Sequence, residues 1–279
     1  MIAVLGMGLL GANFSRALLE RGETVHVWNR SPERAQALVE EGAVAFADAA
    51  EAVAGAERVH IVVSDDAAVD SVLALAQCAP GTLVIDHTTT STRGALARTA
   101  RTDIVYVHAP VFMGPSNARD ATGLMLVSGD RERVDRVRPL LETMTGTLLD
   151  MGERVDAAAG FKLMGNTFLL GHIGAMSDLM ALGKALGIPT EEAVTLLEHF
   201  NPAASAPARS KGIAAGDFSK PSWELVMARK DARLVAEEVA ATDVRLTVLP
   251  GVAERMDEMI ARGHGQDDWA VIAKDSLLP

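Results

Sequence analysis

The sequence predicts an α/β protein in which an N-terminal, doubly wound parallel sheet is joined by a long helix to an all-α C-terminal domain. Three observations predict this fold. Short apolar runs alternate with helical segments in the first half, a glycine-rich turn follows the first run, and strand signals stop after about residue 156. The length of 279 residues suits two domains, which we expect at residues 1–156 and 157–279.

Apolar, β-branched runs mark the predicted strands of the first half. Each run is short, and helical segments lie between the runs. Strands that alternate with helices form a parallel sheet covered on both faces, and right-handed crossovers then give a doubly wound domain. The predicted strands are Ile2–Leu5, Thr24–Trp28, Arg58–Val63, Thr82–Ile85, Ile104–Val107 and Leu124–Val127, and the predicted helices include Asn13–Arg21, Pro32–Glu41 and Arg131–Met144.

A long helical stretch opens the second half, from Gly160 to Gly187, and Pro189 follows it. A helix of roughly 28 residues spans about 40 Å, which exceeds the needs of a small domain. We therefore expect it to connect the domains and to pack against another copy of the chain, in a homodimer or homotetramer. Thr190 is expected to cap a helix at Glu191–Phe200, and further helices are predicted at Ser222–Thr242 and Pro250–Arg262.

Composition narrows the classes of function. Asp and Glu number 37 against 26 Lys and Arg, so the formal net charge is −11, and such a surface repels nucleic-acid backbones and anionic lipid. The single cysteine, Cys78, cannot form an internal disulfide, and no Cys/His grouping has zinc-site spacing. Lys162, Asp178 and Lys184 interrupt the most apolar stretch, which argues against a transmembrane span. We expect a metal-free cytoplasmic protein that acts on a small molecule and binds neither nucleic acid nor membranes.

A G-x-G-x-x-G pattern follows the first predicted strand directly and opens a helix, where a dinucleotide fingerprint belongs. Gly6 permits the tight turn, Gly8 lets the backbone approach a pyrophosphate, and Gly11 lets helix and strand pack closely. The free N–H groups at the helix start then bind phosphate. The alternative is a glycine-rich turn without a ligand. The pattern predicts a dinucleotide-binding Rossmann domain, with contacts from Gly6, Met7, Gly8, Leu9, Leu10 and Gly11.

The end of the second strand distinguishes between nucleotides. NAD-binding proteins usually carry Asp or Glu there, whose charge repels a 2′-phosphate. This chain has Asn29, Arg30 and Ser31, which offer a neutral amide, a cationic fork and a hydroxyl. We therefore expect NADP(H) in preference to NAD(H). The alternative is that Ser31 and Pro32 only begin the next helix and that Arg30 is solvated.

A series of motifs follows along the chain: the glycine fingerprint, Asp86-His87-Thr88-Thr89, Ala109-Pro110-Val111, Gly160 to Asn166, and Lys230-Asp231. Together they resemble the β-hydroxyacid dehydrogenase family, part of the 6-phosphogluconate dehydrogenase-like superfamily. That family includes 3-hydroxyisobutyrate dehydrogenase, tartronate semialdehyde reductase and the succinic and glyoxylic semialdehyde reductases. The resemblance covers nearly the whole chain and implies an NAD(P)-dependent oxidoreductase that acts on CH–OH groups.

The resemblance assigns proton transfer to Lys162. In the family the matching lysine exchanges a proton with the substrate oxygen, and the residue matching Asn166 orients it. The spacing of four residues puts both side chains on one helical face. Hydride addition to a carbonyl carbon leaves charge on the oxygen, which a nearby ammonium stabilises and protonates. Outside such a motif, a lysine on a helix is usually a solvated charge.

Other matches imply contacts with cofactor and substrate. Thr89 matches a threonine near the nicotinamide ring, and Val63 and Ser64 match a turn beneath the adenosine ribose. Lys230, followed by Asp231, matches a lysine that closes over the substrate and nicotinamide. The alternative for this last pair is a surface ion pair.

The substrate loop departs from the family pattern. The family usually has Ser-Gly-Gly after Ala-Pro-Val, and it binds the substrate carboxylate there. This chain instead has Phe112, Met113 and Gly114, so a hydroxyl donor and a glycine are replaced by bulky apolar groups. Ser116 and Asn117 are the nearest candidates for replacement donors.

These observations leave three interpretations. The leading one is an NADP(H)-dependent dehydrogenase of a hydroxy acid or semialdehyde, with Lys162 and Asn166 as catalytic residues. The substrate would be bound by these two with Phe112, Met113, Gly114, Lys230 and Asp231. The second is an imine reductase-like enzyme, or a reductase of bulky apolar carbonyls, which the apolar loop favours. The third is a non-catalytic dinucleotide-binding protein.

Overall fold

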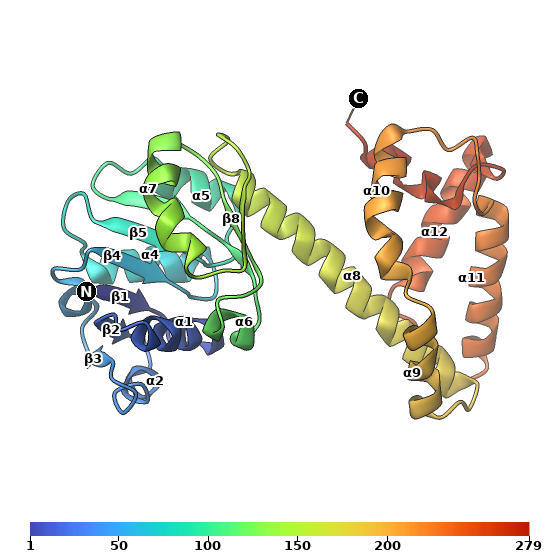
Figure 1. Ribbon diagram of the computed structural model, residues 1–279. Coiled ribbons are helices and arrows are strands. Elements are labelled where there is room, and N and C mark those ends of the chain that lie inside the picture. Colours follow the sequence, from blue (N-terminus) through green and yellow to red (C-terminus); the bar gives the residue numbers. More distant parts are fainter. Residues whose placement is uncertain (279) are drawn as a thin grey trace. The chain divides into compact units, whose positions relative to one another are not determined.

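The computed structural model describes residues 1–278 and confirms an α/β first part followed by a helical second part (Figure 1). Backbone contacts divide the chain into two compact units, of which the first is Met1–Asn166 and the second begins at Thr167. The long helix α8 (Ala157–Ala185) begins in the first unit and continues into the second. The boundary predicted after residue 156 lies at the start of this helix, whereas the two units divide within the helix, between Asn166 and Thr167.

Six parallel strands form the main sheet, in the order β3-β2-β1-β4-β5-β6. The chain starts at β1, winds to one edge through β2 and β3, and then crosses to the other edge, which is the predicted doubly wound topology. The sequence prediction missed β3, which is short and begins with an exposed valine. The strands are β1 (Ile2–Leu5), β2 (Val25–Trp28), β3 (Val44–Phe46), β4 (Arg58–Ile61), β5 (Leu83–Asp86) and β6 (Val105–His108).

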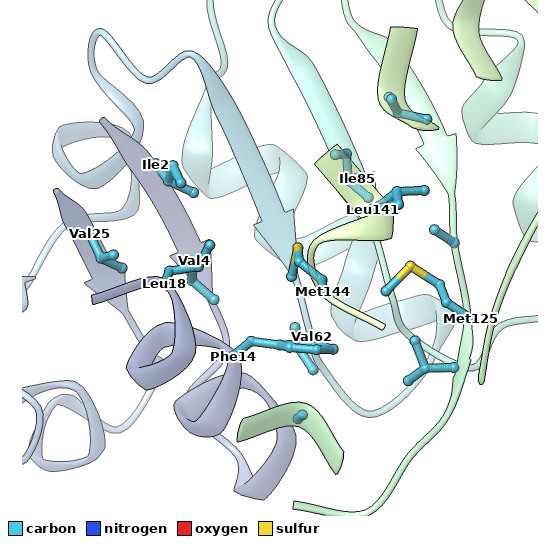
Figure 2. Close-up of a cluster of buried hydrophobic side chains, with 14 of the residues drawn as sticks. Ile2, Val4, Phe14, Leu18, Val25, Val62, Ile85, Met125, Leu141 and Met144 are labelled. Atoms are coloured by element: carbon cyan, nitrogen blue, oxygen red, sulfur yellow. The ribbon is translucent and has the colours of Figure 1, made fainter. Parts of the chain in front are cut away.

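Side chains alternate along β1 between the two faces of the sheet, and helices cover both faces. Ile2 and Val4 belong to a buried cluster with Phe14 and Leu18 of α1 and with residues of α7, part of which Figure 2 shows. Ala3 and Leu5 belong to a second cluster, with residues of α3 and α4. The helices of this unit are α1 (Leu9–Glu20), α2 (Pro32–Gln36), α3 (Ala49–Val53), α4 (Asp66–Ala76), α5 (Thr92–Thr99), α6 (Pro115–Arg119) and α7 (Arg131–Glu142).

A second, smaller sheet follows the first. It consists of β7 (Val111–Phe112), β8 (Leu124–Val127) and β9 (Thr147–Asp150), with β7 antiparallel and β9 parallel to β8. The sequence predicted β8 as one further strand but missed both of its neighbours. β7 has only two residues, and β9 is largely exposed, so neither has the sequence pattern of a buried strand.

The second unit is helical, as predicted, although several boundaries differ. Thr190 is the first residue of its helix and Pro189 occupies the cap position, so the predicted cap was wrong. The helix predicted from Ser222 begins at Leu225, because Ser222 instead donates to the carboxylate of Asp268. The helices are α9 (Thr190–His199), η1 (Pro202–Ser205), α10 (Ala206–Ala215), α11 (Leu225–Ala240), α12 (Leu249–Met259), η2 (Ile260–His264) and η3 (Trp269–Ser276).

Helix α8 has many exposed apolar side chains in this single chain, although no helix within residues 1–278 is both long and apolar enough to span a bilayer. Such an apolar surface is the reason for expecting a homodimer or homotetramer, which stays a prediction. The exposed apolar residues of α8 are Phe161, Leu163, Met164, Phe168, Leu169, Leu170 and Ile173.

Two buried histidines connect the middle strands. His60 on β4 and His87 directly after β5 are almost wholly removed from water, and their rings stack with centroids 5.2 Å apart. Burial lowers the pKa of both imidazoles below their ordinary value of 6.5, and that of His87 to about 4. Both rings are therefore neutral at pH 7.

This neutrality makes the fold sensitive to acid. Below pH 6.5 the unfolded chain takes up protons at these two histidines, whereas folded His87 does not do so until about pH 4. The free energy of unfolding should therefore fall across this window, by about 1.4 kcal/mol per pH unit for each histidine. Urea unfolding at successive pH values measures the slope. The slope should be smaller in a His87→Asn variant, and an unchanged slope would assign the acid sensitivity to other groups.

Candidate active site

The glycine turn at the end of β1 has two positions where only glycine fits. Gly6 has φ +109°, and a Cβ there would lie 2.1 Å from the Val62 carbonyl oxygen. A Cβ on Gly11 would lie 1.9 Å from the Gly6 carbonyl oxygen. These contacts hold the start of α1 directly against the ends of β1 and β4. Gly8 occupies the cap position of α1, and a Cβ there would meet nothing within 4 Å, so the space in front of the helix N-terminus is open.

A cavity of about 590 Å3 begins at this turn. It lies at the carboxyl ends of β1, β2, β4 and β5, where the strand order changes direction and doubly wound folds bind nucleotides. Lys162 of α8 and two residues of the substrate loop also line it. The lining residues are Gly6, Gly8, Leu9, Leu10, Trp28, Asn29, Arg30, Ser31, Arg34, Val62, Val63, Ser64, Ala68, Ser71, Val72, Leu75, His87, Thr88, Thr89, Val111, Met113 and Lys162.

One end of the cavity is cationic. Arg30 and Arg34 are exposed, and within residues 1–278 neither guanidinium has a hydrogen bond or an ion pair. Ser31 begins α2 without a side-chain capping bond, so its hydroxyl is also available. Arg34 was missed by the sequence analysis. The sequence feature that could have identified Arg34 is its spacing of four residues from Arg30, which places both side chains near the start of α2.

Asn29 lines the cavity, and its amide also bonds the backbone on either side. Its Oδ1 accepts the Met7 N–H at 2.9 Å, and its Nδ2 donates to the Ser31 carbonyl at 3.0 Å. The amide therefore joins the glycine turn to the turn after β2. The side chain of Met7 is buried behind the cavity, and neither Met7 nor Gly11 lines it. Their contribution is to shape the turn.

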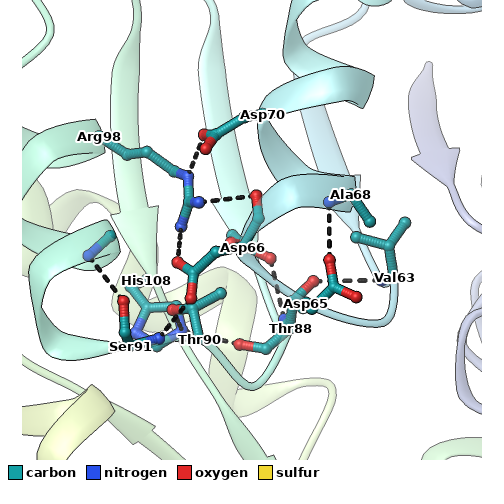
Figure 3. A network of polar contacts seen from close by, with 12 residues as sticks. Val63, Asp65, Asp66, Ala68, Asp70, Thr88, Thr90, Ser91, Arg98 and His108 are labelled. Atoms are coloured by element: carbon teal, nitrogen blue, oxygen red, sulfur yellow. Dashed lines mark hydrogen bonds and ion pairs between the residues drawn. The ribbon is translucent and has the colours of Figure 1, made fainter.

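A polar network fixes the loops that contain Val63, Ser64 and Thr89 (Figure 3). Arg98 is buried and donates to Asp70 Oδ1 at 2.7 Å and to Asp66 Oδ1 at 2.9 Å. Asp66 Oδ2 in turn accepts the Ser91 N–H at 2.8 Å, which ties the loop after β4 to the loop after β5. The Val63 N–H donates to the Thr88 hydroxyl at 3.1 Å. The two loops are thus held at a constant separation along one wall of the cavity.

Asp86 also acts on this wall, as a structural group. One of its carboxylate oxygens accepts the Thr88 N–H at 2.9 Å, and the other accepts the Tyr106 hydroxyl at 2.5 Å. The side chain is completely buried. Its bonds orient the loop after β5 and leave it without access to the cavity.

Lys162 lies at the other end of the cavity. Its side chain is only 8% exposed, and its Nζ donates to Asn166 Oδ1 at 2.9 Å. Nζ also lies 4.0 Å from the centre of the Phe112 ring. Loss of solvent lowers the pKa of Lys162 from its ordinary value of 10.5. The result is a buried amine, held by one amide and one aromatic face, in the same cavity as the glycine turn.

The substrate loop is arranged around this amine. The ring of Phe112 packs on α8 where Gly165 leaves room, since a Cβ on Gly165 would lie 2.3 Å from Phe112 Cζ. The Gly114 N–H donates to Asn117 Oδ1 at 2.9 Å, and Asn117 Nδ2 donates to the Thr122 hydroxyl at 3.0 Å. Asn117 therefore stabilises the loop itself, and Ser116 is exposed away from the cavity lining. Neither residue supplies a donor to the cavity.

The remaining predicted residues lie in the second unit. Lys230 and Asp231 stand on α11 and form an ion pair of 2.7 Å, with both side chains nearly half exposed. Their contact with substrate or cofactor stays a prediction. No grouping of three or more His, Cys, Asp or Glu side chains within residues 1–278 could hold a metal ion.

Comparison with known proteins supports the same chemistry. Residues 1–152 match the family model described as the NAD binding domain of 6-phosphogluconate dehydrogenase. A Mycobacterium bovis protein named "Probable 3-hydroxyisobutyrate dehydrogenase" is 30% identical over 262 residues, covering 86% of each chain. An NAD-dependent L-serine dehydrogenase from Pseudomonas aeruginosa is 28% identical over 292 residues, covering 98% of this chain and 96% of that protein.

Solved structures share the fold over the full length. An imine reductase from Myxococcus stipitatus in complex with NADP+ has a TM-score of 0.87 at 20% identity, covering 98% of this chain and 99% of that one. The family model and the relatives together confirm the resemblance drawn from the motifs. The chain belongs to the β-hydroxyacid dehydrogenase family and is an NAD(P)-dependent oxidoreductase.

Proposed function

We propose that this protein is an NADP(H)-dependent enzyme that interconverts the alcohol and carbonyl forms of a hydroxy acid or semialdehyde, with Lys162 as the proton donor and acceptor. The observation that carries the proposal is the position of Lys162. This buried amine has no carboxylate partner among residues 1–278, and it lines the same cavity as the glycine turn and the exposed Arg30 and Arg34. A lysine with a purely structural role would normally reach solvent or an acidic group.

The residues of the cavity fit a nicotinamide dinucleotide phosphate. The open space at Gly8 and the N-terminus of α1 suit the pyrophosphate. Arg30, Ser31 and Arg34 suit a 2′-phosphate, and none of the lining residues among residues 1–278 is an Asp or Glu that would repel it. When bound, the nicotinamide supplies or takes up the hydride.

The protein's own part in the reaction is proton transfer. As the carbonyl carbon is reduced, negative charge develops on its oxygen, and the Lys162 ammonium stabilises that charge and then protonates it. Asn166 holds Nζ in place through its amide oxygen. Burial weakens the hold of the amine on its proton, which brings its pKa nearer to the range useful for catalysis. In the oxidative direction the neutral amine removes the hydroxyl proton.

Replacement of Lys162 tests the catalytic assignment. A Lys162→Met variant should lose about 10²–10⁴-fold in turnover, because general acid catalysis is worth this much, while its affinity for NADPH stays nearly unchanged. NADPH consumption measures turnover, and fluorescence titration measures binding. Lys184→Met, an exposed lysine on the same helix, is the matched control. Full turnover in the Lys162 variant would refute the assignment.

Replacement of the free arginines tests the nucleotide preference. Arg30→Ala should weaken NADPH binding by about 10- to 150-fold, the equivalent of one charge-assisted hydrogen bond, and Arg34→Ala should act in the same direction. NADH binding should change little in either variant. Arg21→Ala, an exposed arginine that does not line the cavity, is the control. Equal losses for NADPH and NADH would show that these groups do not bind the 2′-phosphate.

A second candidate function is reduction of imines or of bulky apolar carbonyls. The observation that favours it is the Phe112 ring over Lys162, in a loop where the Gly114 N–H and the Asn117 amide bond groups of the loop itself. An apolar ring beside the amine favours an uncharged substituent on the reacting carbon over a carboxylate.

A substrate panel separates the two candidates. If the second is right, the protein should reduce cyclic imines or apolar ketones more efficiently than semialdehydes with a carboxylate. Phe112→Ser should then shift kcat/KM towards the carboxylates, by about tenfold for one new hydrogen bond, while Phe112→Leu should not. A preference of the unmodified protein for hydroxy acids would support the first candidate. NADPH binding without turnover of any panel member would contradict both candidates.

A further inference from the structure

A chain of hydrogen bonds runs through the interior of the first unit to the start of the substrate loop. Arg58 Nε lies 3.2 Å from His60 Nε2, and His60 Nδ1 lies 2.9 Å from His87 Nε2. His87 Nδ1 then lies 2.8 Å from the Ala109 carbonyl oxygen. All three side chains are buried, and none of them was given a role by the sequence analysis.

The groups at the two ends, the Arg58 guanidinium and the Ala109 carbonyl, determine which ring nitrogens of His60 and His87 carry a proton. Arginine only donates, so His60 Nε2 must accept, which leaves the proton of neutral His60 on Nδ1. His60 Nδ1–H therefore donates to His87 Nε2. The proton of His87 is then on Nδ1, which donates to the Ala109 carbonyl. A second proton on either ring would place two donors face to face. The donors of this series of hydrogen bonds therefore all point one way, from Arg58 towards Ala109, and both rings must be neutral.

This series of hydrogen bonds ends at Ala109, and the substrate loop begins shortly after that residue. Two consecutive residues bond Ala109. The carbonyl of Asp86, the last residue of β5, accepts the Ala109 N–H at 2.8 Å, and the ring of His87 donates to the Ala109 carbonyl. Pro110 follows, and then Val111, Phe112 and Met113. Val111 and Met113 line the cavity, and Phe112 covers Lys162. The direction of the polypeptide backbone after Ala109 therefore determines the positions of these side chains.

We infer that His87, held in turn by His60, is a positioning residue that fixes the Ala109 carbonyl and thereby places residues 111–114 against Lys162. His87 lines the cavity but is not a proton donor or acceptor for substrate, because both of its ring nitrogens are already used. The consequence of this positioning for the reaction rests on the proposed function, whereas the placement of the loop does not.

Magnetic resonance of the unmodified protein tests the proton arrangement. In protein labelled with 15N-histidine, both rings should show the neutral form with the proton on Nδ1 at pH 7. Either ring in the charged form, or with its proton on Nε2, would overturn the inference. This measurement needs neither a variant nor a substrate.

Amide hydrogen exchange tests the positioning. His60→Leu removes the support of His87, so the amides of Ala109 and of residues 111–114 should exchange about three- to tenfold faster, as expected for one lost hydrogen bond. His60→Gln, which can both accept from Arg58 and donate to His87, should restore slow exchange. His26→Leu is the matched control, since His26 lies on β2 outside this series of hydrogen bonds, where its ring bonds the Ala52 carbonyl and packs on Phe46. Unchanged exchange at Ala109 and residues 111–114 in folded His60→Leu would overturn the inference.

Kinetics separate this inference from the proposed function. With the best substrate of the panel, His60→Leu should raise KM by about three- to tenfold and leave NADPH binding as it is, because the glycine turn lies outside the hydrogen-bonded chain. If no panel member is turned over, the proposed function fails while the exchange result still stands. A raised KM with unchanged exchange would mean that the histidines act in some other way, and the inference would be wrong.

Discussion

The close contact between Gly11 and the Gly6 carbonyl is the constraint on which the rest of the first unit depends. It brings the N-terminus of α1 to the point between β1 and β4 where the sheet changes direction. Because parallel strands end at the same edge, the turns after β2, β4 and β5 meet at that point too. A side chain at either glycine would separate the helix from the strands, and the cavity would lose its floor.

The cationic groups at the two ends of the cavity differ in their exposure to solvent. At the end after β2, Arg30 and Arg34 are exposed and have no hydrogen-bond or ion-pair partner within residues 1–278, so both guanidinium groups can bind an anion. At the other end, Lys162 is largely buried, and in the described part of the chain its amine contacts the Asn166 amide and the face of Phe112. Desolvation strengthens the interaction of the amine with charge that develops nearby, which is what the proposed proton transfer to an alkoxide requires.

The walls between these ends depend on buried polar groups. Arg98 with Asp66 ties the loops after β4 and β5 together, and Asp86 orients the second of them. His87 continues the same wall to Ala109. Each of these groups has its polar atoms satisfied within the protein, so the loops keep one arrangement. Loops that approach a ligand through their backbone need such fixed positions, since they have few side chains of their own to adjust.

The sequence by itself determined the features that repeat or that need one residue type. Alternating apolar runs predicted the parallel sheet, the glycine spacing predicted the nucleotide turn, and the spacing of four residues predicted that Lys162 and Asn166 share one helical face. Short or exposed strands such as β3, β7 and β9 lack a pattern, and their pairing depends on neighbours distant in the chain. Only the tertiary structure decided that Asn29 serves the backbone, that Arg34 joins Arg30, and that Phe112 covers Lys162. The physical reason is that local patterns record burial and backbone conformation, whereas these roles arise from contacts between residues that folding alone brings together.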